Sequence, residues 1–307
     1  MNKKRNVAVI GSGPAGLSLA TKLVNENYLV TVFDELKEFG GMIAYGIPEF
    51  RIPLKAVKEK ISFAKKCGVI FKRKKINSIK PLLKNFDYIV LAIGAGVGSK
   101  AGFVGENNLN AIDALDFLLK DKLENKKLLK KREKVAVIGG GNSAVDAARV
   151  ALRQGAKATV VYRRTESEMP ALRSELELAK KDKVEFKFLL APLEFISNKK
   201  QSKLICSEMI LGEIDSSGRR KPIDSGKRVT FDFDKVILAI GQEQDYSWLE
   251  KEGIKVEKNK IIVNSEYKTN LDTVYACGDC VSGPKTIAEA TVAGIKCANA
   301  IINKEKI

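Results

Sequence analysis

The amino-acid sequence predicts an α/β fold made of two related units, each built on a parallel β-sheet. The first observation is an internal repeat, because residues 7–11 and residues 135–139 both read VAVIG. The second is a further repeated pair, FDYIVLAIG at 86–94 and FDKVILAIG at 233–241. The third is that each VAVIG run is short, apolar and β-branched, ends at glycine and leads into a helical pattern, as buried parallel strands do. We therefore expect two βαβ units.

The expected elements follow in order along the chain. In the first unit, a helix over Leu17–Asn25 follows the first strand. In the second, a helix over Ala144–Gln154 stops at Gly155, a residue suited to a left-handed cap. From Val274 the chain returns to a strand, a Gly-Asp turn and a helix over about Thr286–Ile302. We place this tail with the first unit, because the second unit already closes at the end of its own FDKVILAIG strand.

The linking segment completes the predicted organisation. The lysine-rich stretch Leu115–Lys134 carries leucines at helical spacing and predicts an amphipathic helix between the units. The predicted domains are residues 1–108 together with 264–307, and an inserted domain over 109–263.

Composition limits the class of protein. The 307 residues suffice for about two domains, and 45% apolar with 30% charged residues is typical of globular proteins. No apolar run approaches a transmembrane helix, and we expect no signal peptide and no membrane insertion. Five scattered cysteines fit the reducing cytoplasm better than a disulfide scaffold. The chain has no histidine, which excludes imidazole chemistry.

The net charge of +17 would attract an acidic protein, an anionic membrane or nucleic acid. Lysine is spread through the chain, however, so we expect a solvated basic surface in place of one concentrated patch. Nucleic acid is not an expected partner.

The first glycine motif predicts a dinucleotide site. Residues 11–16 read GSGPAG, a complete GxGxxG between a strand and a helix. In this motif Gly11 permits the tight turn, Gly13 the approach of a pyrophosphate, and Gly16 close packing of helix on strand. The candidate binding residues of the motif are Gly11, Ser12, Gly13, Pro14, Ala15 and Gly16. Asp34, 23 residues after Gly11, is the candidate for a ribose hydroxyl, and Glu35 is a second one.

The far end of the chain favours FAD in this first site. Residues 275–279 read YACGD and precede a helix near Thr286. Asp279 can then bond the ribityl chain, while amides at the helix start face the pyrimidine edge of the flavin and stabilise negative charge there. The further candidate residues for FAD are Gly41, Met42, Gly94, Gly278, Thr286 and Ile287.

The second glycine motif predicts an NADPH site. Residues 139–144 read GGGNSA, with alanine in the last place of the fingerprint. The position that matches Asp34 is expected to be Arg163, 24 residues after Gly139, followed by Arg164. Two arginines there would bind the 2′-phosphate of NADP. The candidate residues are Gly139, Gly141, Asn142, Ser143, Ala144, Arg163, Arg164 and Gly241. The class is thus two Rossmann-like dinucleotide-binding domains, a two-dinucleotide-binding-domain flavoprotein.

Two longer motifs carry a resemblance to a known family. Residues 40–53 (GGMIAYGIPEFRIP) and 162–171 (YRRTESEMPA) resemble the FAD- and NADPH-binding portion of the glutamate synthase small (beta) subunit family, which is similar to the reductase part of dihydropyrimidine dehydrogenase. The resemblance implies that Arg51 lies at the FAD site, and it supports the roles given to Asp279 and to the arginine pair. Family members usually carry glutamate where this chain has Asp34.

The same resemblance sets expectations about partners. Family members carry an N-terminal iron-sulfur domain, and only six residues precede the first strand here, so we expect that domain to be absent. A glutaminase part is expected to be absent too. Complete glutamate synthase activity is therefore not expected from this chain alone.

The predicted function is an FAD-dependent NADPH oxidoreductase. Hydride would pass from NADPH to flavin N5, and electrons would then pass to a separate acceptor: an iron-sulfur subunit, an acidic ferredoxin, or a quinone. No catalytic side chain and no metal site are predicted. The alternatives are a ferredoxin-NADP or thioredoxin-type reductase, and a non-catalytic electron-transfer subunit of a complex.

A disulfide-reducing function rests on Cys277 and Cys280, which have the spacing of a redox dithiol. Thioredoxin reductases carry their dithiol shortly before the second glycine motif, and this chain has no cysteine between Cys67 and Gly139. The larger disulfide reductases place theirs shortly after the first motif, where this chain has Gly40-Gly41-Met42. The sequence therefore does not favour this function.

Overall fold

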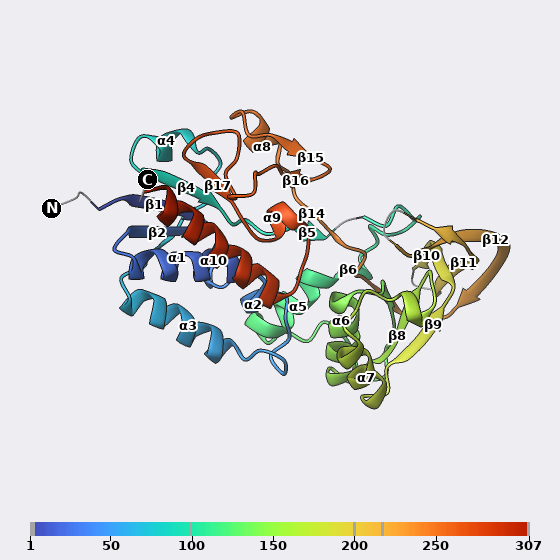
Figure 1. Cartoon of the computed structure of the whole chain (residues 1–307). Helices are drawn as coiled ribbons and strands as arrows, with labels where there is room; N and C mark the ends of the chain where they lie inside the picture. Colours follow the sequence, from blue (N-terminus) through green and yellow to red (C-terminus); the bar gives the residue numbers. More distant parts are fainter. Residues whose placement is uncertain (1–3, 99, 199–200, 216–217, 306–307) are drawn as a thin grey trace. The chain divides into compact units, whose positions relative to one another are not determined.

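Two five-stranded parallel sheets form the chain, which we describe from a computed structural model (Figure 1). The structure describes residues 4–98, 100–198, 201–215 and 218–305. Contacts group the chain into two compact units. Unit 1 contains the N-terminal segment up to Tyr45, Glu49–Val97 and the chain from Gln242 onward, and unit 2 contains Gly46–Pro48 and Gly98–Gly241. The predicted cofactor domains and their bounds stay predictions.

The sheet of unit 1 has the order β17-β4-β1-β2-β3, with parallel pairing throughout. Its strands are β1 (Asn6–Ile10), β2 (Leu29–Asp34), β3 (Ile70–Arg73), β4 (Tyr88–Leu91) and β17 (Val274–Ala276). Ile10 pairs with Phe33 on one side and Leu91 on the other, and Leu91 pairs with Ala276. The four inner strands therefore end level with one another, so the residues that follow them gather at one edge.

Helices of unit 1 cover this sheet. The long ones are α1 (Pro14–Asn25), α3 (Leu54–Lys66) and α10 (Ile287–Lys304), and the short ones are α2 (Met42–Tyr45), α4 (Lys80–Leu83), α8 (Ser247–Glu250) and α9 (Asp279–Ser282). Figure 1 shows α10, in red, alongside α1, in blue. Their apolar sides enclose a core with Leu19, Leu23 and Ile301 at its centre, each fully buried. Short strand pairs add β5 (Val97–Gly98) with β14 (Gln242–Glu243), and β15 (Val256–Glu257) with β16 (Lys260–Ile261).

The sheet of unit 2 repeats the same order, β6-β13-β7-β8-β9. Its strands are β6 (Ala111–Asp113), β7 (Lys134–Ile138), β8 (Lys157–Tyr162), β9 (Glu185–Phe188) and β13 (Lys235–Leu238). Three α-helices belong to it, α5 (Ala114–Glu124), α6 (Asn142–Arg153) and α7 (Arg173–Lys181), together with the 3₁₀ turn η1 (Glu166–Glu168). The α/β class with two parallel sheets, predicted from the internal repeat, is confirmed.

A three-stranded antiparallel sheet in unit 2 has no counterpart among the predicted elements. It consists of β10 (Leu190–Ser197), β11 (Ser202–Ile214) and β12 (Arg220–Phe231). Bulges between Ser207 and Met209 and between Leu211 and Ile214 interrupt the register of the β11–β12 ladder. Such bulges break the strict alternation by which a strand is recognised in a sequence.

The predicted helices compare closely with the observed ones except in the linking segment. Gly155 ends the α6 segment with a φ of +96°, as predicted for a cap. The helix expected over Leu115–Lys134 ends at Glu124, because Asn125 adopts a left-handed φ of 49° and closes it. Within the described ranges, every helix is too short or too polar to cross a membrane.

Candidate dinucleotide-binding sites

The first glycine loop has the geometry that a dinucleotide pyrophosphate requires. Gly11 follows β1 with a φ of +104°, and a β-carbon there would lie 2.1 Å from the carbonyl oxygen of Ala92. A β-carbon on Gly16 would lie 2.1 Å from the carbonyl oxygen of Gly11. Gly13, the N-cap of α1, faces open space, since a β-carbon there meets nothing within 4 Å. Space in front of a helix start that begins with Pro14 and the buried Ala15 fits an anionic phosphate.

Asp34, the last residue of β2, is tied to this loop. Its Oδ2 accepts hydrogen bonds from the amide of Ser12 at 2.8 Å and from the Ser12 hydroxyl at 2.6 Å. The fully buried Ser12 hydroxyl in turn accepts the amide of Gly40 at 2.9 Å. Glu35 points elsewhere, because it is exposed and forms an ion pair with Lys75 at 2.7 Å. Of the two acids considered for a ribose hydroxyl, Asp34 is the one at the glycine loop.

The second glycine pair crosses over the first loop. Gly41 has a φ of +56°, and a β-carbon on it would lie 2.8 Å from the Cα of Gly13. Met42 begins α2, and its sulfur lies 3.9 Å from the side-chain nitrogen of Gln242. Arg51, half-buried, lies in the turn that precedes α3. The close approach predicted at Gly40-Gly41 therefore occurs against the backbone of the glycine loop.

The end of β17 brings Gly278 and Asp279 to the same place. Gly278 has a φ of +79°, and a β-carbon there would lie 2.8 Å from the Cβ of Ala15. Asp279 begins α9 and accepts a hydrogen bond from the amide of Lys285 at 3.3 Å. Burial raises the pKa of Asp279 to about 6, and the nearby carboxylate of Glu289 raises it further, while the Lys285 amide opposes them. A carboxylate at this place thus retains protons into the mildly acidic range.

The start of α10 offers backbone amides. Thr286 is the N-cap, and its hydroxyl accepts the amide of Glu289 at 3.2 Å, while the Glu289 side chain accepts the amide of Thr286. This capping box leaves the amides of Ile287 and Ala288 with no acceptor among the described residues. These amides can donate to a ligand oxygen, as the sequence predicts for Thr286 and Ile287.

Two residues at this edge were not found from the sequence. Tyr246 is buried, and its hydroxyl donates to the carbonyl oxygen of Gly94, which follows β4 with a φ of +74°. Gly294 lies in α10, and a β-carbon on it would stand 2.2 Å from the carbonyl oxygen of Ala15. The only sequence signal for Gly294 is a small residue on the inner side of a helix, which many helices share.

The second glycine loop repeats the geometry of the first. Gly139 has a φ of +143°, and a β-carbon there would lie 2.1 Å from the carbonyl oxygen of Ala239. Gly141 is the N-cap of α6 and faces open space, as Gly13 does in unit 1. The side-chain oxygen of Asn142 accepts the amide of Leu172. Ser143 and the fully buried Ala144 continue the first turn of α6.

The segment after β8 packs on this second loop, a contact that the sequence did not indicate. A β-carbon on Gly140 would lie 2.4 Å from the ring of Tyr162. The Tyr162 hydroxyl donates to the carbonyl oxygen of Glu168 at 3.0 Å, and the amide of Ala171 donates to that of Gly140 at 3.2 Å. The YRRTESEMPA motif is therefore a brace for the glycine loop as well as the carrier of the arginines.

The strand register corrects one expectation about Arg163. Ile10 pairs with Phe33 in unit 1, and Ile138 pairs with Val161 in unit 2. The position equivalent to Asp34 is therefore Tyr162, and Arg163 occupies the place of Glu35. The count of residues from each glycine differed by one, 23 against 24, and this extra residue accounts for the shift.

The two arginines have different surroundings. Arg163 is exposed, and its guanidinium forms no ion pair within the described ranges. Arg164 is only 3% exposed; its Nε donates to the carbonyl oxygen of Arg220, and its Nη2 lies 2.6 Å from Asp215. Gly241, which follows β13, is exposed with a φ of +128°. Arg163 is therefore free to meet a ligand, whereas Arg164 holds the ends of β11 and β12.

The cysteines near the first site are buried thiols. The Cys280 thiol donates to the carbonyl oxygens of Leu91 and Cys277. Its pKa is raised by burial and by the neighbouring Cys277, and that of Cys277 is raised by a hydrogen bond with Cys297 and by burial. Both side chains have no solvent exposure. A reactive dithiol needs accessible thiolates, so this pair lacks the properties of a redox centre.

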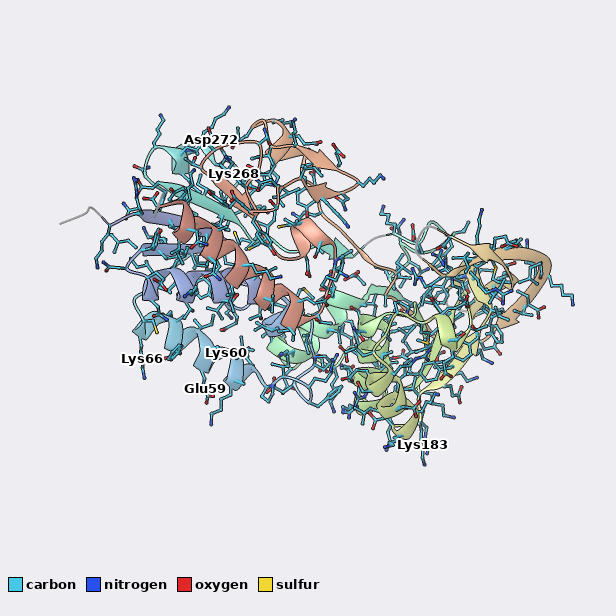
Figure 2. The ribbon with its side chains drawn as sticks, viewed as in Figure 1. Glu59, Lys60, Lys66, Lys183, Lys268 and Asp272 are labelled. Atoms are coloured by element: carbon cyan, nitrogen blue, oxygen red, sulfur yellow. The ribbon has the colours of Figure 1, made fainter. Side chains whose placement is uncertain are left out.

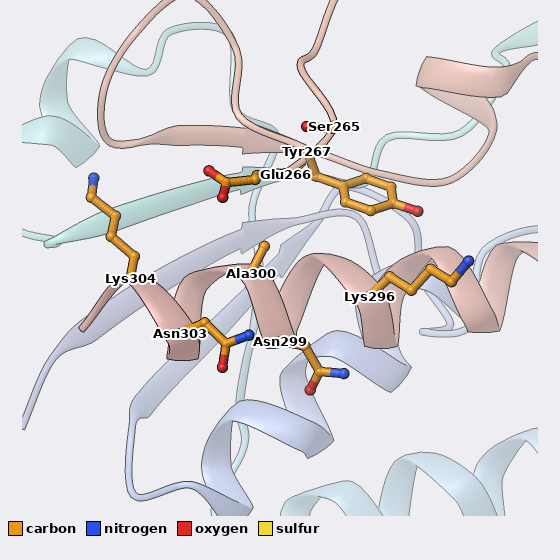
Figure 3. A pocket seen from close by; sticks show the side chains of 8 residues that line it. All are labelled: Ser265, Glu266, Tyr267, Lys296, Asn299, Ala300, Asn303 and Lys304. Atoms are coloured by element: carbon orange, nitrogen blue, oxygen red, sulfur yellow. The ribbon is translucent and has the colours of Figure 1, made fainter. Parts of the chain in front are cut away.

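A hollow of about 400 Å³ lies on another side of unit 1 (Figure 3). Figure 3 shows the ring of Tyr267 above α10, with Lys296 and Asn299 projecting from the helix. Its other lining residues are Ser265, Glu266, Ala300, Asn303 and Lys304. None of the predicted cofactor residues lines it, so we do not assign it to a dinucleotide.

Comparison with known proteins agrees with this geometry. The family model described as pyridine nucleotide-disulphide oxidoreductase matches residues 5–294. The chain is 36% identical to the NADP(+)-dependent formate dehydrogenase subunit beta of Moorella thermoacetica, covering 97% of this chain and 43% of that one. It is 32% identical to the glutamate synthase [NADPH] small chain of Escherichia coli, covering 97% of this chain and 68% of that one. The chain spans only 29% to 43% of the first curated relatives that it matches.

Solved structures show the same fold. The structure of FprA from Mycobacterium tuberculosis in complex with NADPH superposes with a TM-score of 0.82 at 17% identity, covering 99% of this chain and 85% of that one. At this identity the likeness concerns the fold alone. It confirms the predicted arrangement of two dinucleotide-binding domains.

Proposed function

Because the chain belongs to the pyridine nucleotide-disulphide oxidoreductase family, whose members are FAD-dependent NAD(P)H oxidoreductases, we propose that it transfers electrons from NADPH through FAD to a separate acceptor. FAD would be held by unit 1 and NADPH by unit 2. Bound FAD supplies the redox chemistry, taking a hydride from the nicotinamide and passing electrons on. The chain's own residues bind and orient the two cofactors, and no side-chain acid or base is assigned.

The assignment of FAD to unit 1 rests on the groups gathered around its glycine loop. Gly13 leaves room for a pyrophosphate, Asp34 lies within hydrogen-bond reach of the loop, and Asp279 follows β17 at the same edge. The open amides at Ile287 and Ala288 would face an electron-rich group. Arg51 is assigned to the FAD site through the family resemblance.

The assignment of NADPH rests on one observation above all. At the end of the second strand, unit 1 presents Asp34, whereas unit 2 presents Tyr162 followed by the exposed Arg163. A carboxylate would repel a 2′-phosphate, and an arginine binds it with charge-assisted hydrogen bonds. We assign this contact to Arg163, with Arg164 in a supporting role through Asp215.

The acceptor is proposed to be another protein, an iron-sulfur subunit or a ferredoxin. Named relatives include a subunit beta of formate dehydrogenase and a small chain of glutamate synthase, which act within larger enzymes. The alternative of disulfide reduction is not favoured, because Cys277 and Cys280 are buried and their thiol pKa values are raised.

An anaerobic absorbance titration of the purified holoprotein tests the proposal. We expect a flavin spectrum that bleaches on addition of about one equivalent of NADPH, and much slower bleaching with NADH. Turnover of an artificial dye then separates an enzyme from a non-catalytic subunit. A colourless protein that binds no added FAD would refute the proposal, and equal rates with NADH and NADPH would refute the part assigned to Arg163.

A further inference from the structure

Nearly half of the net positive charge lies in one short segment of unit 1. Residues 54–75, which we call the α3–β3 segment, contain nine Lys and Arg and a single acid, Glu59, and so carry +8 of the net +17. Residues 242–307 of the same unit contain nine Lys and Arg against ten Asp and Glu. The expectation of evenly scattered charge is therefore wrong for this unit, where the charge is concentrated.

All nine basic side chains of the segment are exposed. Only two of them form ion pairs within the described part of the chain, Lys58 with Glu38 at 3.6 Å and Lys75 with Glu35 at 2.7 Å. The other basic residues are Lys55, Lys60, Lys65, Lys66, Lys72, Arg73 and Lys74. Most of this charge is thus left for an external partner or for solvent.

Apolar side chains lie within the basic surface. Phe63 on α3 is 60% exposed, and Ile70 at the start of β3 is 52% exposed. Lys60 and Lys66 stand three residues before and after Phe63, so they flank it on the same side of the helix. Figure 2 shows Lys60 and Lys66 on α3, together with the lone acid Glu59. An exposed aromatic ring between cations is typical of an anchor in a protein interface.

Two structural explanations account for only part of this pattern. β3 is the edge strand of its sheet, and lysines on edge strands prevent unwanted pairing, which explains Lys72 and Lys74. It does not explain the five lysines of α3. A solvated helix face usually mixes both signs, as α7 does with Glu175 and Glu177 among its basic residues.

We propose that the α3–β3 segment is the docking surface for the acidic face of an electron-carrier protein. The inference rests on the proposed function, which requires such a partner. The 13 residues of α3 extend over about 20 Å, a length that suits the small interfaces of transient redox complexes. Lysines at the rim would steer the partner in, and Phe63 would slow its release.

The surface suits an acidic protein better than a phosphate backbone. Eight of the nine basic residues are lysine, whereas bidentate phosphate recognition favours arginine. Glu59 lies next to Lys60 on the exposed side and would repel phosphates. Binding to nucleic acid or to an anionic vesicle is therefore an outcome that would overturn the proposal.

The experiment measures binding of the holoprotein to a purified acidic [2Fe–2S] ferredoxin at several salt concentrations. The test variant joins Lys60→Glu with Lys66→Glu, and the matched control joins Lys251→Glu with Lys255→Glu, two exposed lysines of the same unit. We expect the test variant to bind about tenfold more weakly with a smaller salt dependence, and the control to bind as the parent does. Phe63→Ser should speed dissociation and leave the salt dependence unchanged.

Three results would overturn the proposal. They are no binding to the ferredoxin at low salt, equal losses in the test and control variants, and tighter binding through Lys60 and Lys66 to duplex DNA or to phosphatidylglycerol vesicles. Bleaching of the flavin by NADPH is measured on every variant. If bleaching is normal and docking is lost, the docking proposal is tested alone; if bleaching fails in the parent, the proposed function has failed first.

Discussion

A β-carbon added to Gly16 would lie 2.1 Å from the carbonyl oxygen of Gly11, whereas one added to Gly13 would meet nothing within 4 Å. The two glycines stand three residues apart in one motif and have opposite surroundings. Gly16 is needed for packing of α1 on the end of β1. Gly13 has no structural reason to be glycine, which leaves its open space for a ligand.

Matched substitutions separate these roles. Gly16→Ala should lower the free energy of unfolding of the FAD-free protein by about 1–3 kcal/mol, because a backbone oxygen must move. Gly13→Ala should cost at most about 1 kcal/mol, the price of a poorer N-cap, and should weaken FAD binding strongly. Denaturation of the FAD-free protein and fluorescence titration with FAD measure the two effects. Parent-like FAD affinity in Gly13→Ala would show that no pyrophosphate lies there.

Substitution of the two arginines should have distinct effects. Arg163→Ala should raise KM for NADPH about tenfold to a hundredfold and leave KM for NADH unchanged, the loss expected for hydrogen bonds to a charged group of about 1.5–3 kcal/mol. Arg164→Ala should mainly destabilise unit 2, by about 3 kcal/mol, since it breaks a buried ion pair with Asp215. Steady-state kinetics with both nucleotides, together with thermal melts, distinguish the two. Equal kinetic losses in both variants would contradict the division of roles.

The pKa of Asp279 predicts a pH-dependent stability. Burial raises this pKa from an ordinary value of 3.8 to about 6, so the folded state holds a proton that the unfolded state has lost. The contribution of the group to stability is complete below pH 3.8 and is lost as pH rises through about 6. In the FAD-free protein, Asp279→Asn should therefore gain stability relative to the parent between pH 4 and pH 7. Urea denaturation across this range measures the difference, and a difference that stays constant would refute the prediction.

Thiol reactivity checks the burial of the cysteines. Cys67 is partly exposed, and the other four, Cys206, Cys277, Cys280 and Cys297, are buried. A thiol reagent should modify one of the five quickly in the native protein and all five after denaturation. Cys67→Ser should abolish the fast phase and leave NADPH-dependent dye reduction unchanged. Fast modification of two or more thiols in the Cys67→Ser variant would restore the case for a reactive dithiol.

The sequence was most informative where a backbone constraint fixes the residue. Gly11, Gly139 and Gly155 have positive φ values, and glycine there marks the turns that bound α1 and α6. The paired VAVIG runs predicted both parallel sheets for the same reason, since buried strands leave little choice of side chain. These local requirements are visible in a single sequence.

Features that depend on distant contacts were not visible. The brace that Tyr162 and Ala171 form on Gly140 joins residues whose spacing carries no signal. The burial of Arg164 depends on Asp215, 51 residues away. The sheet β10-β11-β12 was missed because bulges interrupt its alternation and much of β12 is exposed. In each case tertiary contacts decided a conformation that local preference left open.

The position of β17 has a consequence for synthesis of the protein on the ribosome. Unit 2 is almost continuous, and its last strand ends at Leu238, so it can fold as soon as that strand has emerged. Unit 1 starts with β1 and gains its last strand and α10 only after residue 273 has been made. A chain interrupted before that point would contain a finished nucleotide-binding half and an open sheet, with the exposed edge of β4 as a target for chaperones and proteases.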